Sequence, residues 1–121
     1  MQIALGELVD RLTICTRKVR LQVNSVTEAE IQEIVKSIVE SLDTLSTEKK
    51  AAFILDICKL ADLNYQIWHL EFDLRTAEEK DLDDALVGRR AKRIRNLNMQ
   101  RNGIRSMINE YSKTGYRIVN L

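Results

Sequence analysis

Two blocks of this sequence place polar side chains on helical faces that are otherwise apolar. In residues 63–71, Asn64 and Glu71 fall on the same face as Trp68. At 100° per residue, these two polar side chains lie only about 20° apart around the helix axis. In residues 97–104, Arg101 falls among leucine and isoleucine side chains. A buried charge is costly unless it is paired, so we predict that Glu71 meets an arginine of the following helix.

Two arginines are possible partners for Glu71. A turn centred near residue 81 favours Arg90, whereas a later turn favours Arg101. The pair has two interpretations, a structural network that fixes helix register or a polar pocket for a small anionic ligand. The ligand-pocket interpretation is based on the planar guanidinium of arginine, which can donate two parallel hydrogen bonds to a carboxylate or phosphate. The candidate ligand-binding residues are Asn64, Trp68, His69, Glu71, Asn98, Arg101, Asn102 and Arg105.

Catalytic and metal chemistry find less support in the residues. His69 is the only histidine, and the two cysteines stand far apart, so a zinc site with four ligands is not predicted. The segments 30–33 and 78–81 match the E-x-x-E and E-x-x-D motifs by which all-α nucleotide pyrophosphohydrolases hold magnesium. One match lies in a first helical turn and the other in a predicted turn, which makes this enzyme the third alternative. We predict no catalytic residue, no metal ligand and no cofactor.

A basic run is the candidate contact for phosphate or nucleic acid. Its five cations are Arg89, Arg90, Lys92, Arg93 and Arg95. On a helix these charges point around much of the circumference, and no aromatic residue lies between them for base stacking. Charge pairing within the protein or between subunits is therefore the favoured interpretation, with nucleic acid the weaker one.

Four helices are predicted to position these groups, over residues 3–21, about 28–44, 46 or 47 to 75, and from between 82 and 89 to near Gly115. The absence of proline allows such long helices. Thr27 and Glu30 have capping-box spacing, with Val26 and Ile31 as a hydrophobic staple. Gly103 interrupts the last helix, which suggests the close approach of another helix or an aromatic ring. The tail 116–121 is left open between an extended segment and a frayed end.

Length and composition describe one domain, residues 1–121. The chain is 45% hydrophobic and 31% charged, the profile of a globular protein. Its charge is uneven, since residues 1–88 carry 10 Lys/Arg against 17 Asp/Glu, and residues 89–121 carry 9 against 1. The sequence has no recognisable signal peptide or membrane span, and its two cysteines are expected to be buried and reduced. The expected location is the cytoplasm.

The predicted architecture is all-α, an antiparallel bundle of about four helices built on a long C-terminal helical hairpin. The two long helices would each reach about 40 Å at 1.5 Å per residue, and the two shorter helices cannot cover them fully. A second copy of the chain is the simplest cover, because symmetric homo-oligomers are common. We therefore expect a homo-oligomer, a dimer or higher.

Three blocks of the chain resemble small helical proteins of unassigned function found in bacteria and their phages. The blocks are 5–14 (LGELVDRLTI), 67–71 (IWHLE) and 97–102 (LNMQRN). The resemblance supports the helical fold and marks Trp68, His69, Glu71, Asn98, Arg101 and Asn102 as family-like positions. It implies no established activity, but it favours a phage-encoded protein.

The predicted function is accordingly a non-catalytic binding or interaction protein that sequesters a host component through a protein partner. The alternative is a bundle that binds a small phosphate-containing ligand or nucleotide through buried arginine and asparagine.

Overall fold

The computed structural model describes residues 2–20, 27–76, 83–112 and 116–118. Along the chain the elements are β1 (Gln2–Ala4), α1 (Leu5–Arg20), α2 (Glu28–Leu42), α3 (Thr47–Thr76), α4 (Asp84–Asn109) and β2 (Tyr116–Ile118). The predicted all-α class and the four helices are confirmed. The predicted helix end at Gly115 is wrong, since α4 ends at Asn109.

Short polar side chains fix where the last three helices begin. The hydroxyl of Thr27 accepts a hydrogen bond from the Glu30 amide at 3.3 Å, which confirms half of the predicted capping box. Ser46 caps α3 in the same way through the Lys49 amide. Asp83 accepts from the Leu86 amide at 2.6 Å before α4. The predicted staple residue Val26 lies outside the described residues.

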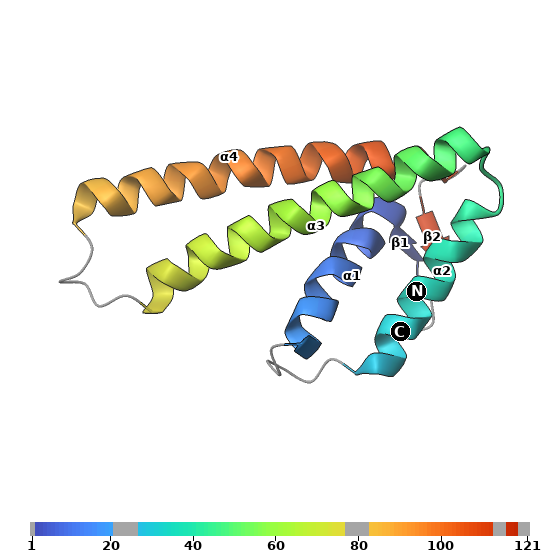
Figure 1. Ribbon diagram of the computed structural model, residues 1–121, viewed down its shortest axis with the longest axis horizontal. Coiled ribbons are helices and arrows are strands. Elements are labelled where there is room, and N and C mark those ends of the chain that lie inside the picture. Colours follow the sequence, from blue (N-terminus) through green and yellow to red (C-terminus); the bar gives the residue numbers. More distant parts are fainter. Residues whose placement is uncertain (1, 21–26, 77–82, 113–115, 119–121) are drawn as a thin grey trace.

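The two long helices α3 and α4 form an antiparallel hairpin, and α1 and α2 cover only part of it (Figure 1). α1 packs against each of the other three helices. The far end of the hairpin, towards residues 76 and 84, extends beyond both shorter helices (Figure 1). The bundle is thus closed at one end and open at the other.

The segment Tyr116–Ile118, left open by the sequence, is a strand. It pairs antiparallel with β1, with Gln2 opposite Ile118 and Ala4 opposite Tyr116. Residues 3 and 4, predicted as the start of the first helix, are therefore extended. This two-stranded ribbon lies beside α2 at the closed end of the bundle (Figure 1).

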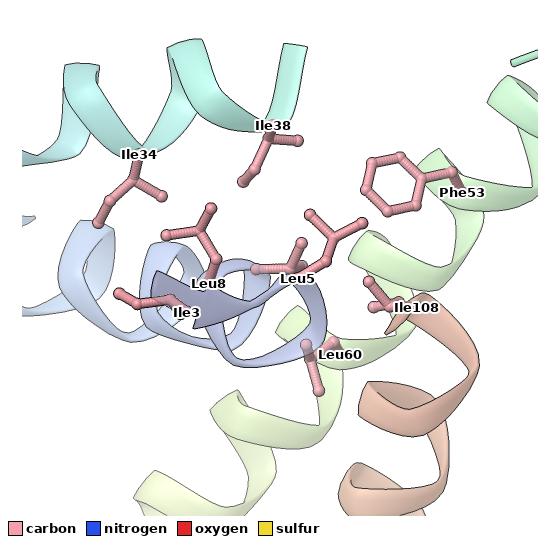
Figure 2. Packing of buried hydrophobic residues seen from close by; sticks show 9 residues of the cluster. Ile3, Leu5, Leu8, Ile34, Ile38, Phe53, Leu60 and Ile108 are labelled. Carbon is pink, nitrogen blue, oxygen red and sulfur yellow. The ribbon is translucent and has the colours of Figure 1, made fainter. Parts of the chain in front are cut away.

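The main core lies where the four helices and β1 meet (Figure 2). Leu5, Leu8 and Val9 of α1 are completely buried there, as are Phe53 of α3 and Ile108 of α4. Each such side chain contributes about 1.5–3 kcal/mol through removal from water. A smaller cluster of Leu63, Ile67 and Leu97 continues along the hairpin. The strongest hydrophobic stabilisation is therefore at the closed end.

Gly6 marks the closest approach of two backbones. A Cβ atom at this position would lie 2.1 Å from the carbonyl oxygen of Arg105 in α4. The Gly6 amide donates to Oδ1 of Asn109 at 2.6 Å. The prediction that Gly103 permits such an approach is wrong, because a Cβ there would meet no other atom of the described residues within 4 Å.

Candidate functional site

A buried polar cluster lies between α1, α3 and α4, with the Asp10 carboxylate at its centre. Asp10 is 4% exposed. Its Oδ1 accepts from Nε of Arg101 at 2.9 Å, and its Oδ2 is paired with the same guanidinium in a two-point contact. Such a bidentate pair is the strongest geometry that arginine and carboxylate form. It ties the first helix to the last.

Two polar side chains orient this pair from either side. Nδ2 of Asn64 donates to Asp10 at 2.7 Å and lies 2.8 Å from the Thr13 hydroxyl. Oδ1 of Asn98 accepts from the Arg101 guanidinium at 3.3 Å. The carboxylate and the guanidinium therefore each have a further hydrogen-bond partner, which a buried charge pair requires.

Charge and hydrogen bonding control the ionisation of Asp10. Burial alone would raise the pKa of this carboxyl, but hydrogen bonds from Arg101 and Asn64 and the charges of Arg101 and Arg105 hold it below its ordinary value. Nη1 of Arg105 lies 3.9 Å from the carboxylate. The pKa of Arg101 is raised, first by its hydrogen bond to Asp10 and further by the charges of Asp10 and Glu71. The pair is ionised at neutral pH.

The predicted pairing of Glu71 with an arginine is wrong. Arg101 binds Asp10 of α1, a residue that the hairpin argument left out. Glu71 is only half-buried and acts on Arg101 through its charge. Asn102 is exposed and also stays outside the cluster. Of the predicted ligand-binding residues, the cluster brings together Asn64, Asn98, Arg101 and Arg105.

Next to Asn64, α3 carries an aromatic strip formed by Tyr65, Trp68, His69 and Phe72. Trp68 and His69 were predicted as ligand-binding residues, whereas Tyr65 and Phe72 were not. Trp68 stacks on Phe72 with ring centroids 5.0 Å apart, and its edge meets His69 at 5.3 Å. Tyr65 lies 4.3 Å from His69. Tyr65 is 49% exposed and Phe72 42%.

Arg17 of α1 reaches across to this strip. Its guanidinium carbon lies 4.4 Å from the ring centre of Tyr65 and 5.0 Å from that of Trp68. One terminal nitrogen is 2.8 Å from Nε2 of His69. The buried Nε has no hydrogen-bond partner among the described residues. No described carboxylate forms an ion pair with Arg17, so the two aromatic rings and the contact with His69 hold this cation.

α1 and α3 enclose a cleft beside these rings, of about 320 Å³. Ligand pockets in proteins begin at about this size. We call it the aromatic cleft; its walls include Thr13, Ile14, Arg17, Asn64, Tyr65 and Trp68. Thr13 and Asn64 thus belong both to the cleft wall and to the buried cluster.

A second buried carboxylate, Asp56, lies at the closed end of the bundle. It is 5% exposed and accepts a hydrogen bond from the Tyr111 hydroxyl at 3.1 Å. The Tyr111 ring meets Phe53 edge to face at 4.8 Å. Burial and the neighbouring Asp56 raise the pKa of the Tyr111 hydroxyl. This contact joins α3 to the residues after α4.

The basic run lies on the open part of α4. Arg89, Lys92, Arg93 and Arg95 are exposed, and Arg90 is half-buried. Arg93 donates to Oε1 of Gln66 at 3.3 Å. The cations are spread around the helix, as the sequence predicted.

Two other sequence predictions bear on chemistry. The cysteines are not both buried, since Cys58 is exposed and Cys15 half-buried, and both are free. Burial raises the pKa of the Cys15 thiol.

Residues 78–81, the second magnesium motif, lie outside the described residues. Within the described part of the chain, His, Cys, Asp and Glu nowhere gather in threes as a metal site requires. Nor does any helix there have the length and apolarity to cross a membrane.

Asp10, Thr13 and Arg17 are the site residues that the sequence argument missed. They recur at three- and four-residue spacing, so they line one face of α1 beside its apolar stripe. That spacing was a usable signal.

Comparison of the chain with known protein families, with curated proteins and with solved structures finds no match. The similarity to bacterial and phage proteins therefore stays a prediction, and function must be argued from the residues themselves.

Proposed function

We propose that this chain is a non-catalytic binding protein that holds a protein partner at the aromatic cleft and the adjoining aromatic strip. The observation that carries the proposal is the stacking of Arg17 against Tyr65 and Trp68 at the mouth of a cleft. Tryptophan, tyrosine and arginine are the residues most enriched at the energetic centres of protein interfaces. Here all three occur together, with Tyr65 and Phe72 substantially exposed.

The surroundings of the strip support the same proposal. The hairpin extends past α1 and α2 (Figure 1), and Tyr65 and Phe72 of the strip remain 49% and 42% exposed, which leaves surface for a partner. Aromatic side chains bury large areas at little conformational cost. In line with the sequence resemblance, we propose a phage-encoded protein that acts in the cytoplasm by sequestering a host component.

The experiment compares partner capture by full-length wild type with two variants. Tyr65→Ala removes an exposed ring of the strip, and Met99→Ala is the control, a 68% exposed side chain of α4. Proteins from a bacterial lysate are quantified on each, and the best candidate is purified for calorimetry. We expect its affinity to fall at least tenfold for Tyr65→Ala and to stay unchanged for Met99→Ala. Equal affinity for both variants overturns the proposal.

A specific observation favours a second candidate function, binding of a phosphate-containing ligand or nucleotide. A shallow groove beside α1 is lined by Arg11, Lys18, Arg101 and Arg105 together with Glu7, Asp10 and Glu30. The Arg105 side chain is 30% exposed, with its nearest carboxylate oxygen 3.9 Å away. Thermal-shift screening with nucleotides and inorganic phosphate tests this function, and stabilisation that is lost in Arg105→Gln supports it.

Self-association is the remaining proposal. Large apolar side chains are exposed on three helices, among them Val39, Ile54, Leu55, Met99 and Met107. Exposed apolar surface of this kind favours contact with a second copy. Light scattering across a range of concentrations is expected to give a dimer or larger species, and a monomer at the highest concentration contradicts this expectation.

A further inference from the structure

We infer that the aromatic cleft recognises a carboxylate carried beside an apolar side chain, in an acidic segment of the partner protein. This inference rests on the proposed function, because it names the chemistry of the partner at the same cleft. Arg17 is the anchor for the carboxylate, and the walls formed by Ile14, Tyr65 and Trp68 take the apolar group.

The first argument is the incomplete pairing of Arg17. A guanidinium has five N–H donors, and the described residues engage it through one contact, with His69. Its Nε is buried and has no hydrogen-bond partner in the part of the chain that the structure describes. The guanidinium carbon lies over the rings of Tyr65 and Trp68, and these contacts use no N–H donor, so the terminal nitrogens keep donors for a ligand. Carboxylate and phosphate oxygens both suit paired N–H donors of this kind, and the acidic side chains of a protein segment supply the carboxylate.

The second argument is the nature of the cleft walls. Besides Arg17 and Lys18, the lining is mainly apolar or aromatic. The Thr13 and Thr16 hydroxyls donate to backbone carbonyls of their own helix, at 2.8 and 2.9 Å, which reduces their capacity to bind a polar ligand. An ion pair formed on entry of an apolar group is strengthened as water leaves. The cleft therefore suits an anion with an apolar body better than a free hydrophilic anion.

The third argument is a contrast with Arg101, which is half-buried like Arg17. Arg101 already holds Asp10 at two points and donates to Asn98. A carboxylate from a partner would have to displace Asp10 in order to bind Arg101. The same carboxylate could bind Arg17 without displacing any described carboxylate, so charge complementarity favours Arg17 as the docking point.

Trp68 is the only tryptophan and forms part of the cleft wall, so its fluorescence reports occupancy. Full-length protein is titrated with octanoate, octyl phosphate and octanamide, which share an apolar body and differ in their head group. We expect octanoate to shift the emission and octanamide to bind about tenfold more weakly, the effect of losing one charge-assisted contact. Octyl phosphate binding more tightly than octanoate overturns the assignment to a carboxylate.

Variants tie the effect to Arg17. Arg17→Gln is expected to abolish the preference for octanoate over octanamide, and Arg17→Lys to retain part of it. Arg95→Gln, an exposed cation of α4, is the matched control and keeps the full preference. Thermal melts of each variant establish that it is folded. Equal binding of the amide, absence of any shift up to the solubility limit, or a preference that survives in Arg17→Gln overturns the inference.

The same variants separate this inference from the proposed function. If the purified partner binds Arg17→Gln as well as wild type but loses affinity for Tyr65→Ala, the inference is wrong and the proposed function stands. If the partner binds all variants equally, both are wrong. Loss of partner affinity in Arg17→Gln, with recovery in Arg17→Lys, supports both.

Discussion

Arg101 and Arg17 both lie near Asn64, but they differ in how far their charge and their N–H donors are paired. Arg101 is half-buried and pairs with the buried Asp10, and both oxygens of that carboxylate have a partner. Arg17 rests on aromatic rings, with a buried nitrogen left without a hydrogen bond among the described residues. A saturated cluster of this kind holds helices together, because any ligand there must first break an existing pair. An unsaturated cation at a cleft can gain a new partner at little cost.

The comparison assigns different roles to residues that the sequence placed in one group. Asn98, Arg101 and Asn64 were predicted as ligand-binding, but their hydrogen bonds are directed inwards to Asp10 and to each other. Trp68 and His69 belong to the same group of predicted residues, but Trp68 lines the cleft and His69 contacts Arg17 beside it. The difference is visible only when the partners of each polar atom are known.

The largest expected effect on stability concerns the Asp10–Arg101 pair. Arg101→Met leaves the Asp10 carboxylate buried without its main counter-charge, so the free energy of unfolding should fall by about 3–5 kcal/mol. Urea denaturation measures it. Arg95→Met, an exposed position on the same helix, should change it by less than about 0.5 kcal/mol. A loss in Arg101→Met no greater than in Arg17→Met contradicts the comparison.

A smaller effect is expected when the polar groups are kept and only the helix spacing changes. Gly6→Ala forces α1 away from the Arg105 carbonyl, which should cost about 1–3 kcal/mol. Gly103→Ala is the matched control, because its methyl group meets open space and alanine favours helix by about 1 kcal/mol. Thermal denaturation should therefore show the two substitutions shifting Tm in opposite directions. Equal shifts mean that the close approach of α1 and α4 does not limit stability.

Acid should weaken the saturated cluster by protonating the Asp10 carboxylate. Because the folded-state pKa of Asp10 is lowered, its contribution is complete above the unfolded pKa of about 3.9 and is lost as pH falls through the folded value. The stability difference between wild type and Asp10→Asn should therefore shrink below about pH 4. Urea unfolding at a series of pH values measures it, and a constant difference contradicts the lowered pKa.

The smallest expected effect on stability concerns Arg17. Arg17→Met should change the free energy of unfolding by no more than about 1 kcal/mol, since only cation–π contacts and the contact with His69 are lost. Binding is expected to respond more strongly than stability, with the octanoate preference abolished. A large stability loss at Arg17 shows that both arginines are structural.

Much of the fold was predictable from local signals. Apart from the end of α4, hydrophobic periodicity and the Thr27 cap located the helices within a few residues, because these patterns depend on neighbours in the chain. The strand pair β1–β2 was not predictable, since each strand has three residues and its partner lies more than a hundred positions away. The site shows the same division. Burial of Asn64 and Arg101 followed from their helical faces, but their common partner in α1 required knowing how three helices cross.

The Asp10–Arg101 contact also bears on the order in which the protein folds. It joins residues 91 positions apart, and the Gly6–Asn109 bond spans 103. The α3–α4 hairpin needs only a short loop to close, and local contacts form fastest. During synthesis, α1 leaves the ribosome before the helix that carries its counter-charge exists. We therefore expect the hairpin to form first and α1 to dock late, so that Asp10→Asn accelerates unfolding in stopped-flow measurements more than it slows refolding.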